Sequence, residues 1–183
     1  RELDIRRERD LARMQANQDA LTGLLNRRAW SEAARQRIAD TRIRPQALLF
    51  LDLDHFKTLN DGYGHVAGDQ ALVALAQTLR DELQPDDLLG RYGGEEFVAL
   101  AGRMDMDSAM QLAQRLCRRV DALRMVLDED GTQLTASSGV ACLRDDDNLA
   151  SLVRRAAAAM YQAKAGGRNR AVSAAKAPHD QPR

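Results

Sequence analysis

Cysteine is almost absent from the chain, which has only two among its 183 residues, Cys117 and Cys142. They lie far apart in apolar surroundings and without the spacing of a metal-binding pair, which argues against a cysteine-based metal centre. We expect both to be buried, reduced thiols, which fits a cytoplasmic compartment. A single disulfide between them is the alternative.

Long hydrophobic runs are also missing. No apolar run approaches the ~18 residues that span a bilayer, and the Arg- and Glu-rich start does not resemble a secretory signal. We therefore expect no membrane segment in these residues. The first residue is not methionine, so we expect the chain to be part of a longer protein.

There is no excess of charge of either sign, since 27 Lys and Arg balance 27 Asp and Glu. A protein dedicated to nucleic acid or to anionic membranes carries a basic face or arm, so both classes are disfavoured. The length suits one domain that buries an ordinary core.

Apolar periodicity predicts helices alternating with strands, and hence a single α/β or α+β sandwich domain. The predicted elements are a charged helix over 1–18, a helix over 27–39, a buried strand over 47–53, a helical turn over 55–60 broken by Gly62 and Gly64, a helix capped by Asp69 and running to 83, a hairpin of strands 88–92 and 97–101, a helix over 108–123, a hairpin turn at Asp130-Gly131, a strand over 134–143, a helix over 149–165 and a strand over 169–172. We assign 1–18 as a linker, 19–173 as the domain and 174–183 as a disordered tail.

The first helix carries a thin apolar stripe formed by Leu11, Met14 and Leu21, together with Gln18. A solvated helical linker and a short coiled-coil stalk explain this stripe equally well.

Two acidic groups carry the chemistry. Asp52-Leu53-Asp54 ends the buried strand, where a structural role for carboxylates is not expected because buried charge needs compensation. A bound Mg²⁺ would supply this compensating charge.

The second acidic motif, Gly93-Gly94-Glu95-Glu96, forms a hairpin turn, which taken alone is most simply a solvated turn. Beside Asp52, it would complete a two-metal carboxylate site, and its glycines would let another molecule approach the backbone.

Basic residues near these acidic loops, Lys57, Lys164 and Arg168, are candidate phosphate ligands, although each alone is most simply a surface charge. His55 and His65 have no second ligand at metal spacing, so we expect them to stabilise loops.

A series of ordered segments covering about residues 17–173 resembles the GGDEF family of diguanylate cyclases. The segments are Asp19–Arg28, Asp52–Asp61, Gly64-His65, Gly68-Asp69, Arg91–Phe97, Thr135–Ala141 and Met160–Arg170. The resemblance implies a mostly antiparallel central sheet surrounded by helices, similar to nucleotidyl cyclases and polymerase palms.

The resemblance also implies roles for individual residues. Metal ligands would be Asp52, the Leu53 carbonyl and Glu95, with Glu96 assisting the metals or the deprotonation of the 3′-hydroxyl. Guanine would be bound by Asn60 and Asp69. The rest of the substrate would be bound by Phe56 through its backbone, Lys57, Gly93, Gly94, Lys164 and Arg168.

The implied reaction condenses two GTP molecules into cyclic di-GMP and two pyrophosphates, using two Mg²⁺ ions per site, with Mn²⁺ as the alternative ion. Each domain supplies half of the reacting geometry, so a homodimer is implied, together with an upstream sensory domain and a cytoplasmic location, alone or as part of a membrane-bound protein. The main alternative is an inactive domain that senses GTP or cyclic di-GMP. A different cyclic dinucleotide is a third possibility, which Asn60 and Asp69 disfavour.

One segment departs from the family pattern. The inhibitory product site, Arg-x-x-Asp, corresponds to Gln84–Asp87 here, and the arginine is replaced by Gln84. Because the guanidinium fork is lost, we expect this site to be broken.

Overall fold

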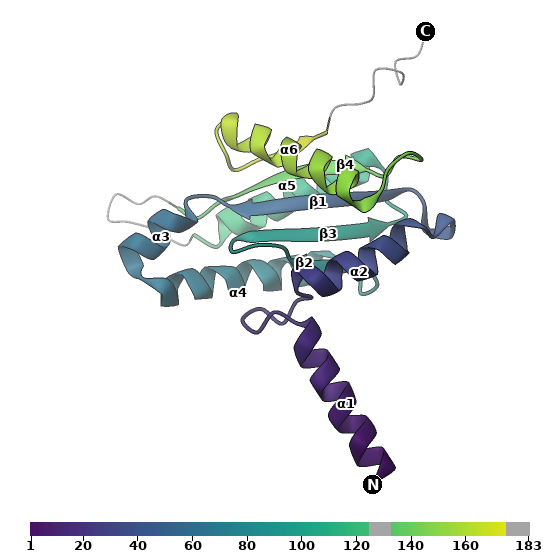
Figure 1. Ribbon diagram of the computed structural model, residues 1–183. Coiled ribbons are helices and arrows are strands. Elements are labelled where there is room, and N and C mark those ends of the chain that lie inside the picture. Colours follow the sequence, from purple (N-terminus) through teal and green to yellow (C-terminus); the bar gives the residue numbers. More distant parts are fainter. Residues whose placement is uncertain (125–132, 175–183) are drawn as a thin grey trace.

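Figure 1 shows the computed structural model of the chain, in which residues 1–124 and 133–174 are described. Along the chain, the elements are α1 (Glu2–Asn17), α2 (Arg27–Ile38), a 3₁₀ turn (Thr41–Ile43), β1 (Gln46–Leu53), α3 (Phe56–Tyr63), α4 (His65–Glu82), β2 (Leu88–Arg91), β3 (Glu96–Gly102), α5 (Met106–Ala122), β4 (Ala136–Cys142), α6 (Leu149–Ala165) and β5 (Ala171–Ser173). The turn predicted at Asp130-Gly131 and residues 175–183 of the predicted tail lie outside the described residues.

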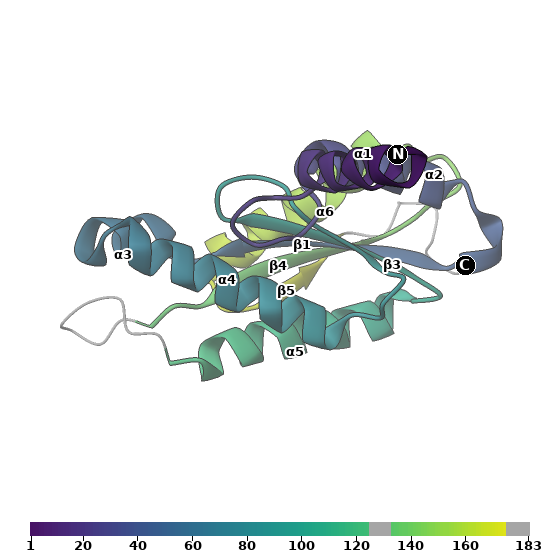
Figure 2. The same cartoon turned by 90° about the horizontal axis from the view of Figure 1, so that it is seen from below.

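The described strands form one sheet in the order β2-β3-β1-β4-β5. All neighbours pair antiparallel except β4 and β5, which are parallel. The predicted mostly antiparallel sheet is therefore confirmed. Figure 2 shows the layers, with α2 and α6 on one face of the sheet and α4 and α5 on the other.

The central strand β1 is buried along its whole length. Its side chains alternate between two cores, because Leu49 and Leu51 join the cluster under α4 and α5, whereas Leu48 and Phe50 join the one under α2 and α6. Both faces are covered, which explains the uninterrupted apolar run. The same alternation directs Asp52 to the α2/α6 face.

The region between β1 and α4 differs from the prediction. Helix α3 runs through Gly62 to Tyr63, and Gly64, with φ 83°, separates it from α4. Because α4 already begins at His65, Asp69 lies inside the helix and its predicted role as a helix cap is wrong.

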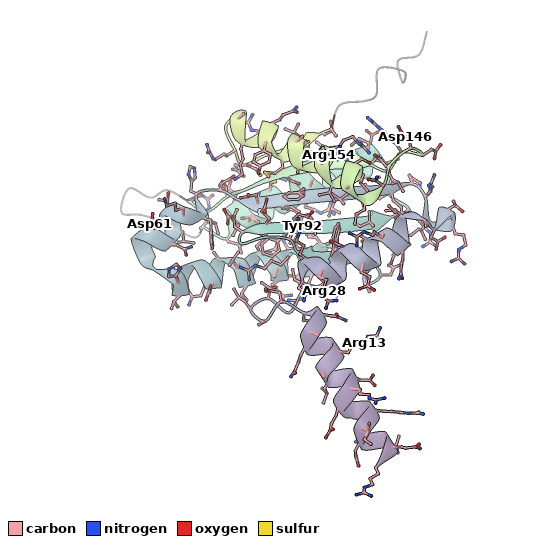
Figure 3. All side chains as sticks on the ribbon, in the orientation of Figure 1. Arg13, Arg28, Asp61, Tyr92, Asp146 and Arg154 are labelled. Atoms are coloured by element: carbon pink, nitrogen blue, oxygen red, sulfur yellow. The ribbon has the colours of Figure 1, made fainter. Side chains whose placement is uncertain are left out.

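The first helix projects away from the domain, and it has no buried residue (Figure 1). Leu11 and Met14 are more than half exposed, and Arg13 lies on the same projecting helix (Figure 3). The predicted stripe is shorter than expected, because α1 ends at Asn17 and Leu21 instead packs against the core.

The two cysteines are free thiols, as expected; Cys117 is buried as predicted, whereas Cys142 is only half-buried. Burial raises the pKa of the Cys117 thiol to about 12. Among the described helices, none is both long and apolar enough to cross a membrane.

Candidate active site

Asp52 lies at the end of β1 with 8% of its surface exposed, opposite Glu96 of β3. The amide of Leu53 donates to the Glu95 carbonyl at 3.2 Å, which fixes the turn between β2 and β3 beside the strand end. Burial raises the pKa of Asp52 to about 6, although Lys164 lowers it, and Glu95 and Glu96 raise it further. This carboxylate therefore lies where additional positive charge would stabilise its ionised form.

The turn Gly93–Glu96, named here the GGEE turn, is closed by the amide of Tyr92, which donates to the Glu96 carbonyl at 2.8 Å. A Cβ on Gly93 would overlap Oε1 of Glu96, so a larger residue there would require the Glu96 side chain to shift. Burial raises the pKa of Glu96, and the charge of Glu95 adds to the effect.

Arg91 connects the GGEE turn to the beginning of the domain. Its Nε and Nη2 donate to the Gly94 carbonyl at 3.0 and 2.7 Å, and its Nη1 donates to both carboxylate oxygens of Asp19 at 3.1 and 3.2 Å. Burial raises the pKa of Asp19, but hydrogen bonds from Thr22 and Arg91 outweigh it, so the net shift is downward. Sequence reasoning gave Arg91 and Asp19 no role, although both lie in the segments that carry the family resemblance.

Asp54 is fully buried, and its carboxylate has four hydrogen-bond donors. Oδ1 accepts from the Ser137 hydroxyl at 2.8 Å and from Lys164 Nζ at 3.1 Å. Oδ2 accepts from the Thr135 hydroxyl at 2.7 Å and from the Asn169 amide at 3.1 Å. The expectation that neither carboxylate at this strand end is structural is wrong for Asp54, because protein donors already compensate it.

Lys164 lies between the two carboxylates, with its Nζ 3.1 Å from an oxygen of Asp52 and of Asp54. It comes from the last turn of α6 and is followed by the exposed Arg168. The C-terminal end of α6, α3 and the GGEE turn all lie at one end of the sheet (Figure 1). The structure thus brings the predicted acidic groups together with Lys164.

The candidate guanine ligands lie on α3 and α4, away from this network. The Oδ1 atom of Asn60 is buried, has no hydrogen-bond partner in the part of the chain that the structure describes, and lies against Gly68, where a Cβ would overlap it. Asp69, the next residue, is exposed. An unpaired buried acceptor is costly unless a ligand donates to it.

The remaining predicted substrate ligands lie at the start of α3. Phe56 is its first residue, and its ring packs partly against the core, whereas Lys57 is exposed. His55, which precedes the helix with φ 58°, is exposed, as is His65. The loop-stabilising role of the two histidines stays a prediction.

Metal binding requires a particular donor set. In residues 1–124 and 133–174, no three His, Cys, Asp or Glu side chains are grouped to hold an ion. The expected set of Asp52, Glu95, Glu96 and the Leu53 carbonyl contains three carboxylates, which the described residues do not hold together as a ligand group, although Asp52 lies opposite Glu96 across β1 and β3. Mg²⁺ keeps several waters and shares substrate phosphates, so two carboxylates beside a phosphate-binding surface fit it.

The segment Gln84–Asp87, which corresponds to the product site, folds on itself. The Asp87 carboxylate accepts from the amide of Gln84 at 3.0 Å and from the amide of Gly102 at 3.4 Å. Asp87 therefore closes its own turn, and the side chain at Gln84 offers no guanidinium fork.

Comparison with known proteins places this site in context. The family model described as "Diguanylate cyclase, GGDEF domain" matches residues 16–170. The chain is 39% identical over 162 residues to "Cyclic di-GMP phosphodiesterase NbdA" of Pseudomonas aeruginosa, covering 87% of this chain but 21% of that protein. It is 38% identical over 160 residues to "Diguanylate cyclase DgcP" of the same species, covering 86% of this chain and 24% of that protein.

A solved structure is also similar over nearly its full length. The coiled coil and GGDEF domain of DgcB from Caulobacter crescentus, in complex with c-di-GMP, superposes with a TM-score of 0.87 at 31% identity, covering 93% of this chain and 92% of that one. The chain spans about a quarter or less of the two curated relatives, so those whole proteins extend well beyond it. The family match over most of the chain, the fold and the grouped acidic residues agree, and this chain belongs to the GGDEF domain family of diguanylate cyclases.

Proposed function

We propose that this domain condenses two GTP molecules into cyclic di-GMP. The observation that carries the proposal is the grouping of Asp52, Glu95 and Glu96 beside Lys164 at one end of the sheet. Carboxylates that oppose one another in a partly buried site are suited to bind metal ions that stabilise a triphosphate.

In each half-reaction, the 3′-oxygen of one GTP bonds to the α-phosphorus of the other, and the bond between the α-phosphorus and the bridging oxygen breaks to release pyrophosphate. Two Mg²⁺ ions, when bound by Asp52, Glu95 and the Leu53 carbonyl, would neutralise charge on the phosphates. Glu96, whose pKa is raised by burial, would accept the 3′-hydroxyl proton. Lys164 and Arg168 would hold the departing pyrophosphate.

The base would be selected on the α3/α4 side. Asn60 presents a buried carbonyl oxygen without a donor, and Asp69 presents an exposed carboxylate. Both accept hydrogen bonds. Guanine offers its N1–H and the adjacent amino group to such acceptors, whereas adenine cannot offer donors in that arrangement.

One domain provides one base site and one acidic site, whereas the product joins two guanylates through two phosphodiesters. Two domains must therefore face each other with two-fold symmetry, so that each 3′-hydroxyl reaches the opposite α-phosphate. The projecting α1, with exposed Leu11 and Met14, would hold two chains side by side.

The alternative is a domain that binds GTP or cyclic di-GMP without turnover. Both curated relatives described above are longer proteins, one named a cyclase and the other a phosphodiesterase. The grouping of Asp52, Glu95, Glu96 and Lys164 favours turnover, because a binding role alone does not require an acidic site.

The proposal is tested by incubating the protein with GTP, ATP and Mg²⁺ and identifying the products by mass. Cyclic di-GMP and pyrophosphate are expected, with specific activity per chain rising with protein concentration. Bound but unconverted GTP at high protein concentration would favour the sensor. A flat specific activity across a hundredfold dilution of a chain shown to be monomeric would exclude the paired-site mechanism.

A further inference from the structure

We infer that Asp54 is a positioning residue, which fixes Lys164 and the turn carrying Arg168 before any nucleotide binds. The inference rests on the proposed function in one respect, the binding of the triphosphate by Lys164 and Arg168. It concerns a side chain that makes no contact with substrate in that proposal, because it is completely buried.

The first argument is the chemistry of the four donors around Asp54. The hydroxyls of Thr135 and Ser137 can donate or accept, and rotate to suit their partner. The ammonium of Lys164 and the amide of Asn169 can only donate. Only a carboxylate, with acceptors on both oxygens, satisfies these two donors at once.

The second argument is the backbone that Asp54 holds. Gly167, Arg168 and Asn169 follow one another with φ of 116°, 65° and 47°. Residues other than glycine rarely adopt this left-handed region, and they keep it where the surrounding structure imposes it. The hydrogen bond from the Asn169 amide to Asp54 Oδ2, at 3.1 Å, ties this turn to the end of β1. It adds to other contacts of the same turn, in which the Arg168 amide donates to the Ala163 carbonyl at 3.0 Å and the Asn169 side-chain amide donates to Asp121 at 3.2 Å.

The third argument concerns the ammonium group. Lys164 Nζ lies 3.1 Å from Asp52 Oδ1 and 3.1 Å from Asp54 Oδ1. Asp54 lies deeper, since it is fully buried, whereas Asp52 keeps 8% of its surface exposed. Asp54 therefore anchors Lys164 from the protein side. The third N–H of the ammonium is left for an anion at the mouth of the site.

The test uses Asp54→Asn, which keeps the shape but replaces one acceptor by a donor. Either Lys164 or Asn169 must then face an N–H group, whereas the hydroxyls can rotate. The matched control is Ser137→Ala, which removes one hydroxyl donor to Asp54 and leaves the Lys164 and Asn169 contacts in place.

Binding is measured by calorimetry with Mg²⁺ and two probes that cannot react, 3′-deoxy-GTP and 3′-deoxyguanosine. These probes differ only in the triphosphate. In Asp54→Asn, the Kd of 3′-deoxy-GTP should rise about tenfold or more, the size of one charge-assisted hydrogen bond. The Kd of 3′-deoxyguanosine should stay within about twofold, and Ser137→Ala should change neither Kd by more than about threefold.

A uniform loss for both probes, or equal losses of 3′-deoxy-GTP affinity in both variants, would overturn the inference and leave Asp54 with a merely structural role. Wild-type protein that binds 3′-deoxy-GTP no more tightly than 3′-deoxyguanosine would instead contradict the proposed function. If Asp54→Asn binds 3′-deoxy-GTP as tightly as the wild type does, the positioning role of Asp54 is contradicted, but the proposed function is not.

A second measurement needs no variant, in case Asp54→Asn fails to fold. Hydrogen exchange followed by NMR reports the protection of the Asn169 amide in wild-type protein. This amide should be protected without nucleotide and change little when 3′-deoxy-GTP and Mg²⁺ are added. Protection that arises only with nucleotide would show that the substrate forms the turn, and the inference would be wrong.

Discussion

The two sides of the candidate site are built differently. On the side assigned to the metals and phosphates, Asp54 has four donors, Lys164 is shared by two carboxylates, and Arg91 binds the GGEE turn. On the side formed by α3 and α4, which carries the assigned base ligands and the candidate phosphate ligand Lys57, Asp69 and Lys57 are exposed, and the buried oxygen of Asn60 has no partner among the described residues. The first side is fixed by contacts within the protein, whereas we propose that a ligand completes the second.

This difference follows from what each side must do. Charge that develops during phosphoryl transfer is best stabilised by groups that need not reorganise. A base edge is recognised by hydrogen bonds that replace those with water, and an open surface lets the base enter and leave. We therefore expect substitutions on the fixed side to affect turnover most, and those on the open side to affect selectivity.

The largest effect should come from Asp52→Asn, which removes a charged ligand from the fixed side. Turnover measured by pyrophosphate release should fall about a thousandfold or more, because phosphate charge in the transition state is left without its counter-ions. The control is Asp61→Asn, an exposed carboxylate on α3 at the outer end of the molecule (Figure 3). Near-normal turnover in Asp52→Asn would place the acidic site elsewhere.

A smaller effect, on selectivity, should follow from Asp69→Ala on the open side. The ratio of kcat/KM for GTP to that for ATP should fall by about 10- to 100-fold, since base-edge hydrogen bonds to a charged acceptor are lost. Equal losses for the two nucleotides would show that Asp69 does not read the base. Melting temperature should hardly change, because this side chain is exposed.

A third effect concerns stability, where Asp19→Asn releases Arg91 and loosens the fixed side. The folded state lowers the pKa of Asp19 below its ordinary 3.8, so its contribution is present above that value and is lost as pH falls through the folded pKa. At pH 7, the variant should lose about 1–2 kcal/mol of unfolding free energy.

Urea unfolding at pH 7 and near pH 2.5 measures this contribution, and the difference between wild type and variant should shrink at the lower pH. The control is Asp145→Asn, whose partner is Arg44 and whose side chain is 96% exposed. It should have little effect at either pH, because exposed pairs contribute little. A pH-independent loss in Asp19→Asn would mean that its charge is not what stabilises the turn.

The smallest effect should come from Lys57→Ala, which removes an exposed charge on α3. KM for GTP should rise by no more than about fivefold, with kcat nearly unchanged, and the difference should diminish in high salt because exposed charges are screened. If Lys57→Ala lost as much turnover as Asp52→Asn, the open side would have to become as rigid as the fixed side once substrate binds.

Much of the fold could be predicted from local pattern. The run over 47–53 is continuous because β1 is covered on both faces, and α6 was predicted with its observed bounds, starting after Asn148, which caps it together with Ser151. The start of α4, in contrast, depended on where the preceding helix ends. Asp69 has the residue type of a cap, but Gly64 ends α3 and lets α4 start at His65.

The sequence by itself determined which side chains are available for chemistry and the order in which they occur, because motif spacing and apolar periodicity are local properties. It could not separate Asp52, on β1, from Asp54, which directly follows that strand. Only the tertiary structure decided their roles, since Thr135, Ser137, Lys164 and Asn169 reach Asp54 from segments more than 80 positions away. Those donors compensate Asp54, whereas Asp52 shares Lys164 and faces the like charges of Glu95 and Glu96, which supports Asp52 as the proposed metal ligand.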